Sequence, residues 1–168
     1  MSLIEFKNIS KAFGENSVLS GVDLKIQQGE TLTILGGSGT GKSVFLKLLL
    51  GVLAPDEGAV FFQGKNLADM TEDKLIGMRR KIGMLFQGSA LFDSLTVFEN
   101  IVYPLREHFS YSDHQLSEFV AAKLEMVGLP GLEDKYPGEL SGGMKKRVGL
   151  ARAIATDPSV ILYDEPTT

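Results

Sequence analysis

Hydrophobic and polar residues alternate in the first part of the chain, as they do in strands with one buried face. The alternation covers residues 3–9 and residues 18–26, and a turn at Gly14, Glu15 and Asn16 separates the two runs. Further apolar runs of strand length lie at residues 31–35, 59–63, 82–86 and 160–163. We therefore predict an antiparallel β layer at the N-terminus, followed by buried strands of an α/β domain.

The pattern changes to a helical period between residues 88 and 137. Apolar residues recur there every three or four positions, and Gly128 closes the second of two stripes. The stripes consist of Val97, Ile101 and Leu105, and of Leu116, Phe119, Val120, Leu124 and Val127. Shorter helices are predicted at residues 44–50, after Thr71 and after Ser141.

These patterns divide the chain into three parts. Residues 1–87 hold the β layer and the first part of the core, and residues 88–140 form a helical insertion. Residues 141–168 return to the core with a helix and a strand. No repeat or low-complexity segment interrupts this order.

Composition restricts the class of protein. The 168 residues are 43% hydrophobic and 23% charged, with a formal net charge of −4 and no cysteine. These values are typical of a folded globular domain, and the acidic balance argues against a general nucleic-acid-binding surface. Disulfides and cysteine-based zinc sites are excluded. No apolar run of this sequence reaches the about 20 residues that span a membrane, so we expect membrane association through a partner.

One glycine-rich loop has the spacing of a phosphate-binding site. It lies between a predicted strand and a predicted helix and matches the pattern Gly, any four residues, Gly, Lys, Ser. Its residues are Gly36, Gly37, Ser38, Gly39, Thr40, Gly41, Lys42 and Ser43. Such glycines let backbone N–H groups face phosphate oxygens at the positive end of a helix dipole, while Lys42 would bridge the outer phosphates and Ser43 would ligate Mg²⁺. The alternative is a glycine-rich turn that precedes a lysine by chance.

Polar residues also follow two later strands. Gln87 follows one of them, and Asp164 and Glu165 follow the other. Functional groups in open α/β sheets collect at the carboxyl ends of strands, so we predict these residues and the glycine loop at one sheet edge. Asp164 suits Mg²⁺, and Glu165 would orient or deprotonate an attacking water. The alternative for Gln87 is an ordinary polar residue at the end of a strand. The alternative for Asp164 and Glu165 is an acidic surface turn.

A second glycine pair lies at the predicted start of a helix. Ser141 is a good N-cap, and Gly142 and Gly143 follow it as an anion-binding nest. The basic residues 145–147 are typical of a solvated helix face, in keeping with the acidic chain. Phe13, beside the first turn, is by itself more typical of a packing residue than of a base-stacking one.

These features resemble the nucleotide-binding domain of ATP-binding cassette (ABC) proteins. Five of them match in that family's order: Phe13, the Walker A loop at residues 36–43, Gln87, the signature at residues 140–143, and Walker B at residues 161–164 with Glu165. The resemblance covers the whole chain. It implies a P-loop NTPase (RecA-like) α/β core with an N-terminal antiparallel β layer and an inserted α-helical subdomain.

The resemblance also implies roles. Phe13 would stack on the adenine of ATP, and Gln87 would touch Mg²⁺ and the attacking water. Ser141, Gly142 and Gly143 would donate to the γ-phosphate of an ATP held by the opposite subunit. A head-to-tail homodimer would therefore close on ATP and open after hydrolysis.

By the same resemblance, the partner is a transmembrane permease, reached from the cytoplasmic side of the inner membrane. Its coupling helix would lie in a groove around residues 86–104, where Leu91, Phe92, Leu95 and Val97 offer apolar surface. Each of these four residues is equally typical of an ordinary subdomain core.

Two stretches point to a subfamily. Residues 100–108 and 140–154 are similar to the Mla-type ATPases of phospholipid trafficking systems, which work with MCE proteins. Met144 stands where the family usually has Gln, and a thioether cannot replace the amide as a hydrogen-bonding group. The alternative is the ATPase of an importer for amino acids or another small solute.

The chain departs from the family pattern at its end. Family members continue to a D-loop, a further strand and a switch His, and neither His108 nor His114 stands at that position. We therefore expect this sequence to be part of a longer chain. We also expect hydrolysis by the fragment to be impaired, because the D-loop and the switch His are absent from it. A second class is a soluble ABC protein acting on ribosomes or DNA, whose usual accessory modules are not seen in this sequence. A third is a hydrolysis-dead regulatory or structural fragment, which the intact Lys42, Asp164 and Glu165 argue against and the missing switch His argues for.

Overall fold

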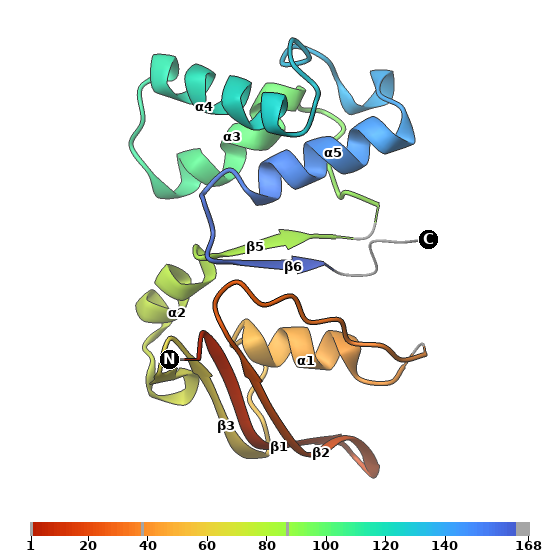
Figure 1. The fold of residues 1–168 in the computed structure, drawn as a ribbon, viewed down its shortest axis with the longest axis vertical. Coiled ribbons are helices and arrows are strands. Elements are labelled where there is room, and N and C mark those ends of the chain that lie inside the picture. The colour runs from red at the N-terminus through yellow and green to blue at the C-terminus, as the bar shows by residue number, and fades with distance from the viewer. Residues whose placement is uncertain (1, 38, 87, 164–168) are drawn as a thin grey trace. The chain divides into compact units, whose positions relative to one another are not determined.

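The computed structural model describes residues 2–37, 39–86 and 88–163, which form two compact units, Met1–Arg79 and Arg80–Thr168 (Figure 1). The first unit contains β1 (Ile4–Phe13), β2 (Asn16–Ile26), α1 (Lys42–Leu49), β3 (Glu57–Phe62), β4 (Lys65–Asn66), the 3₁₀ helix η1 (Leu67–Asp69) and α2 (Glu72–Arg79). The second contains β5 (Ile82–Leu85), α3 (Val97–His108), α4 (Asp113–Met126), the 3₁₀ helix η2 (Pro137–Glu139), α5 (Gly142–Ala153) and β6 (Val160–Tyr163).

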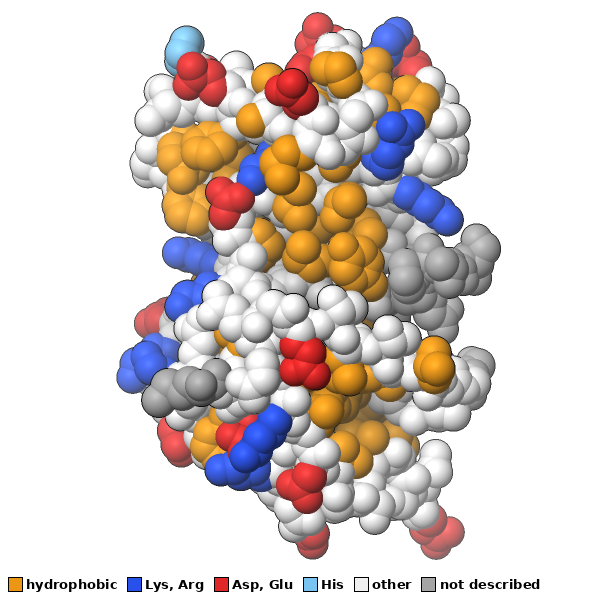
Figure 2. Space-filling model, in the orientation of Figure 1, with side chains coloured by type: hydrophobic (Ala, Val, Ile, Leu, Met, Phe, Trp, Pro, Cys, Tyr) orange, Lys and Arg blue, Asp and Glu red, His pale blue; other side chains and the backbone are white. Residues whose placement is uncertain are grey.

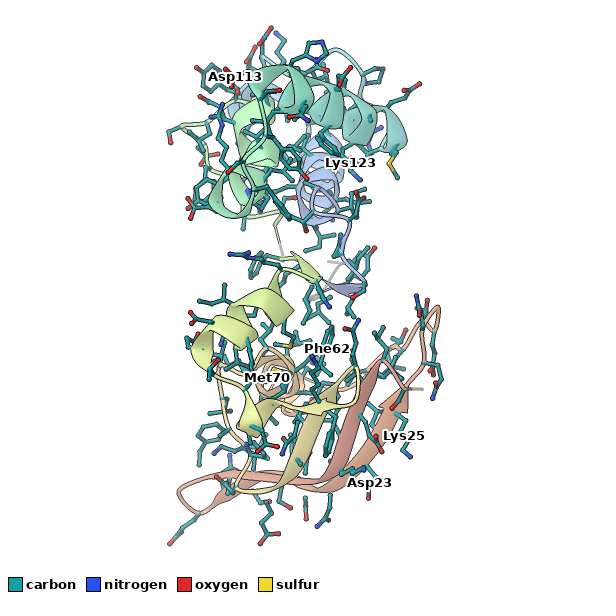
Figure 3. All side chains as sticks on the ribbon, turned by 90° about the vertical axis from the view of Figure 1, so that its left-hand side faces the viewer. Asp23, Lys25, Phe62, Met70, Asp113 and Lys123 are labelled. Carbon is teal, nitrogen blue, oxygen red and sulfur yellow. The ribbon has the colours of Figure 1, made fainter. Side chains whose placement is uncertain are left out.

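The first unit is an antiparallel sheet in the order β2-β1-β3-β4, which confirms the predicted β layer. Alternation sets its two faces: Asp23 and Lys25 of β2 point outward (Figure 3), and Leu24 between them is half-buried. Ile4 of β1 pairs with Ile26 on one side and Phe62 on the other. The sheet therefore has one continuous apolar face.

Helix α1 packs on that face. It buries Phe45, Leu48 and Leu49, which share one side of the helix, and the Phe45 ring stacks on Phe6 of β1 with 4.0 Å between ring centroids. Each fully buried leucine contributes about 1.5–3 kcal/mol. This packing holds the start of α1, and hence the glycine loop before it, against the β layer.

The second unit has a helical core beside a parallel pair of strands. Strands β5 and β6 run parallel, with Leu85 opposite Tyr163. Helix α5 packs on β5 and also contacts α3 and α4. Capping boxes at Thr96 and Ser112 begin α3 and α4. The helical core includes both predicted stripes: Val97, Ile101, Leu105, Leu116, Val120 and Leu124 are buried, with Phe119 and Val127 packed against them.

The strand predicted over residues 31–35 is wrong. This segment is irregular and exposed, and Leu35 is 89% exposed. The described strands form two sheets, β2-β1-β3-β4 and β5-β6, and neither includes it. An apolar run becomes a strand only when a neighbour satisfies its N–H and C=O groups, and no described strand does so here.

Candidate nucleotide-binding site

The glycine loop at residues 36–43 begins helix α1 with left-handed backbone. Gly39 has φ 80° and Gly41 has φ 94°, and Gly41 is the N-cap of the helix. A Cβ on Gly41 would lie 2.7 Å from Cγ1 of Val18 in β2. Both its conformation and its surroundings therefore require glycine at this position.

Lys42 turns back over this loop. Its Nζ donates to the carbonyl oxygens of Gly36 and Gly37, at 2.6 and 2.8 Å, and Oγ1 of Thr40 also donates to Gly37, at 2.8 Å. A single ammonium group is thus held inside the curve of the loop. Ser43 follows in the first turn of α1 and is exposed. A cation, a hydroxyl and helix-start N–H groups therefore meet at one loop, which is a donor set for phosphate.

Phe13 lies at the hairpin end of the same unit. It ends β1 opposite Asn16, and its side chain is 50% exposed. Because Val18 of this hairpin contacts Gly41, the hairpin passes beside the glycine loop. The Nζ of Lys11 lies 5.6 Å from the centroid of the Phe13 ring. The exposed aromatic is thus available for stacking.

Asp56 fixes this end of β1. One carboxylate oxygen accepts from Nζ of Lys11 at 2.6 Å, and the other accepts from the backbone N–H of Ala12 at 2.8 Å. The hydrogen bond from Lys11 lowers the pKa of Asp56 below its usual value, with help from the Ala12 N–H. The residue before Phe13 is therefore held in place by a charged contact.

The signature residues open helix α5 in the second unit. Ser141 is the N-cap, and its Oγ accepts from the N–H of Met144 at 3.3 Å. Gly142 and Gly143 are exposed, and no described atom lies within 4 Å of the position that a Cβ would take on either. Packing within the described part of the chain therefore does not require glycine here. The absence of side chains leaves the first-turn N–H groups open to an approaching group.

Met144 takes a packing role. Its side chain is partly buried and lies against the helical core, one turn before the fully buried Val148. A flexible thioether fits such a gap, where an amide would need hydrogen-bond partners. The unusual fifth signature residue thus strengthens the attachment of α5 to α3 and α4.

The remaining predicted residues follow the parallel strands. Leu85 and Tyr163 end β5 and β6 as direct neighbours, and Gln87 and Asp164 come shortly after these strand ends in the sequence. Phe86 and Tyr163, at these ends, are 44% and 48% exposed. Hydrophobic side chains also gather on the face of the second unit that Figure 2 draws. Ser38, Gln87, Asp164 and Glu165 themselves lie outside the described residues.

Three residues that support the site were not singled out from the sequence. Asn100 is fully buried, and its Nδ2 donates to the carbonyls of Phe92, Leu95 and Thr96 at 2.9–3.1 Å. Gly149 and Arg152 of α5 both contact the segment after Gln87. Their signals were weak: an amide beside two buried aliphatic residues, and a glycine and an arginine within an apolar helix.

No helix among the described residues is long and apolar enough to cross a membrane. No group of three or more His, Cys, Asp or Glu residues with metal-site geometry occurs in residues 2–37, 39–86 and 88–163.

Sequence comparison relates the chain to one family. The profile described as ABC transporter matches residues 19–168. The protein TRIGALACTOSYLDIACYLGLYCEROL 3, chloroplastic, of Arabidopsis thaliana is 49% identical over 98% of this chain and 50% of its own length. The intermembrane phospholipid transport system ATP-binding protein MlaF of Escherichia coli (strain K12) is 41% identical over 98% of this chain and 61% of its own.

A third relative carries a different description. The probable ribonucleotide transport ATP-binding protein mkl of Mycobacterium leprae is 46% identical over 97% of this chain and 47% of its own length. The chain thus spans about half the length of the curated relatives it matches first.

Solved structures have the same fold. The dimeric post-hydrolysis state of the ATP-binding cassette MJ0796, bound to ADP and Pi, matches with a TM-score of 0.83 and 35% identity over 98% of this chain and 74% of that one. The structure of cbiO1 from Clostridium perfringens, part of the ABC transporter complex cbiONQ, matches with a TM-score of 0.89 and 28% identity over 99% of this chain and 66% of that one. The predicted P-loop NTPase α/β fold is confirmed.

Proposed function

The chain belongs to the ABC transporter family, and from this premise we propose that its full-length protein binds ATP with Mg²⁺ and hydrolyses it to drive transport. The observation that carries the proposal is the loop at residues 36–43. Glycine is required at Gly41, and the Lys42 ammonium lies against the carbonyls of Gly36 and Gly37. These residues fit a nucleotide phosphate chain because they supply N–H donors and a cation without a bulky side chain.

We assign the chemistry to residues of this loop and of the strand ends. Lys42 would bind the outer phosphates, and Ser43, Gln87 and Asp164 would hold Mg²⁺, whose charge would offset that of the phosphates. Glu165 would accept the proton of the attacking water. Phe13 would stack on adenine, where an exposed ring contributes about 1–3 kcal/mol per base.

We further propose that the active form is a homodimer. The glycines at the start of α5 are open and are not required by the described packing around them. Ser141, Gly142 and Gly143 would therefore donate to the γ-phosphate of ATP bound by a second copy. The related cassette MJ0796 has a dimeric structure bound to ADP and Pi, which supports this arrangement.

The substrate class we propose is phospholipid. The MlaF relative is described as part of an intermembrane phospholipid transport system, and the similarity covers nearly the whole of this chain. A small solute is the second candidate, because mkl is described as a probable ribonucleotide transport protein. The inner membrane's cytoplasmic side would be the site of action, with a permease and an MCE-type lipid-binding protein as partners.

The permease would contact residues 86–104. Phe92 and Tyr103 are 44% and 47% exposed, and their ring centroids lie 5.1 Å apart. Val97 is fully buried in the helical core. The proposed contact surface therefore consists of the two aromatics and the partly buried Leu91 and Leu95, without Val97.

The test uses the full-length protein with Mg²⁺ and ATP. Lys42→Ala should weaken ATP binding roughly 10- to 100-fold, since a hydrogen bond to a charged group contributes about 1.5–3 kcal/mol. Glu165→Gln should retain ATP binding, lose hydrolysis and accumulate as a dimer. Titration of ATP, phosphate release and size-exclusion chromatography measure the three effects.

The matched control is Lys47→Ala, an exposed lysine on the same helix, which should leave ATP binding unchanged. Normal turnover by Glu165→Gln would remove Glu165 from the role of base. Co-purification from native membranes separates the substrate classes. An MCE protein supports phospholipid, and a permease with a solute-binding protein supports the small solute.

A further inference from the structure

The segment that directly follows Gln87 has an unusual backbone. Gly88, Ser89 and Ala90 all have positive φ, at 73°, 70° and 44°. Ser89 and Ala90 are not glycines, and left-handed backbone is unfavourable for residues with a Cβ. Ser89 is also buried, with 3% of its surface exposed. Contacts with the rest of the unit must therefore hold this segment in its conformation.

Arg152 supplies two of these contacts. Its Nη2 donates to the carbonyl of Ser89 at 2.8 Å, and its Nη1 donates to the carbonyl of Ala90 at 2.9 Å. The guanidinium also lies over the ring of Phe92, with 5.9 Å between Cζ and the ring centroid. The planar fork of one arginine thus binds two consecutive left-handed residues and the aromatic that follows them.

The charge of Arg152 is directed to backbone oxygens. Burial lowers the pKa of Arg152, but an arginine remains charged at neutral pH. Within residues 2–37, 39–86 and 88–163, no carboxylate lies within salt-bridge distance of it. The partly buried guanidinium is held by the carbonyls of residues 89 and 90, and it holds those carbonyls in turn.

A second residue of α5, Gly149, allows the helix to lie close to Ser89 and Leu85. A Cβ on Gly149 would lie 3.0 Å from Cβ of Ser89 and 3.2 Å from Cδ1 of Leu85. Gly149 stands three residues before Arg152, so both face the same side of the helix. Helix α5 begins at the signature residues and contacts the post-Gln87 segment near its end. The helix is a rigid connection between the two.

We propose that Arg152 is a positioning residue that fixes residues 88–90 to the signature helix and thereby sets the position of Gln87 toward Mg²⁺ and water. The inference rests on the proposed ATPase function. It adds a connection within one chain, by which the position of the signature helix determines the geometry of the segment after β5. Arg152 itself touches neither nucleotide nor metal in this role.

The experiment measures ATP hydrolysis by the full-length protein as a function of Mg²⁺ concentration. Arg152→Gln should lower kcat roughly 10- to 100-fold, the scale expected for a displacement of about 1 Å in a catalytic group. It should also raise the Mg²⁺ concentration for half-maximal activity, while the Kd for ATP without Mg²⁺ stays near the wild-type value. The kcat of Arg152→Lys should lie between those of the wild type and Arg152→Gln, because lysine keeps the charge but lacks the planar pair of N–H donors.

The matched control is Arg147→Gln. Arg147 lies on the same helix and also donates to two carbonyls, those of Val127 and Gly128 at the end of α4. Its loss should leave the Mg²⁺ dependence unchanged. Added methylguanidine should restore part of the activity of Arg152→Ala, which a defect in folding alone would not allow.

The outcomes are separable. If the wild-type protein does not hydrolyse ATP, the proposed function fails before the variants are compared. If the wild type is active and the Arg152 variants keep its Mg²⁺ dependence, the positioning role is wrong and the ATPase function stands. A lower melting temperature with activity lost only in proportion to unfolded protein would also overturn the positioning role.

Discussion

At the scale of single residues, one carboxylate determines how Phe13 is presented. Asp56 holds the Lys11 ammonium and the Ala12 N–H, the two groups that precede Phe13 on β1. Its own N–H donates to the carbonyl of Ser10 at 2.9 Å. The loop before β3 is thus attached to the end of β1 through one aspartate, and the aromatic at that end stays exposed at a fixed place.

This contact makes the stability of the first unit depend on pH. The folded-state pKa of Asp56 lies below its unfolded value, so folding favours the charged form. The stabilisation is present at neutral pH and is lost as pH falls below about 3.8, through the lowered pKa. Asp56→Asn should therefore lower the melting temperature at neutral pH and differ less from wild type in acid.

Thermal melts of both proteins across this pH range check the prediction. Asp93→Asn is the control, because Asp93 is exposed and has no salt bridge to any described residue. An equal difference between Asp56→Asn and wild type at neutral and acidic pH would contradict an ionic contact.

Residue types predicted a glycine loop before a helix but not the contacts that hold the first unit together. The spacing from Gly36 to Ser43 predicted such a loop, and Gly41 is the N-cap of α1 in the structure. The bond of Asp56 to Ala12 joins residues 44 positions apart. A contact of that sequence separation depends on the folded hairpin, and no local pattern of residue types carries it.

At the scale of elements, glycines set how closely α5 packs on β5. A Cβ on Gly83 of β5 would lie 2.2 Å from the carbonyl oxygen of Ala153 and 3.0 Å from Cγ of Pro158. On the helix side, a Cβ on Gly149 would likewise lie too close to Leu85 of β5, at 3.2 Å from its Cδ1. The strand and helix can therefore approach only where both lack side chains, and this approach sets the place of the segment after β5.

Gly83→Ala should force the two elements apart. Overpacking of a well-packed core costs about 1–3 kcal/mol, and the backbone oxygen of Ala153 cannot move aside as a side chain could. Urea unfolding of the full-length protein measures the loss. Gly138→Ala is the control in the same unit, because a Cβ there would meet no described atom within 4 Å. Equal stability of the two variants would contradict this packing.

Periodicity predicted the helices well and one strand wrongly. The stripes of α3 and α4 are a local property, since residues three or four apart share a helix face whatever the rest of the chain does. Residues 31–35 have the same apolar character as β5, but a strand needs a neighbour. β5 has Tyr163 opposite Leu85 at its end, whereas no described strand pairs with residues 31–35.

At the scale of the whole molecule, the proposed site is divided between two compact units. The phosphate loop and Phe13 belong to residues Met1–Arg79, and the signature residues belong to Arg80–Thr168. In the proposed dimer, each ATP would contact the loop of one copy and the signature of the other. A defect in the loop of one copy would then affect one of the two ATP sites, and a defect in the signature of that same copy would affect the other.

This division predicts complementation between inactive variants. Lys42→Ala should bind ATP roughly 10- to 100-fold more weakly, so its own loop stays nearly empty at ATP concentrations close to the wild-type Kd. Ser141→Arg should bind ATP but keep its signature from the ATP of the second copy, so each variant alone should be nearly inactive. In a mixed dimer both defects fall in one shared site and the other site is intact. An equal mixture should therefore recover roughly a quarter of wild-type hydrolysis, since half of the dimers are mixed and each has one working site. Steady-state phosphate release at several mixing ratios measures it, with each variant alone as the control. A mixture as inactive as its components would contradict sites shared between copies, because a site contained in one chain gains nothing from a partner with a different defect.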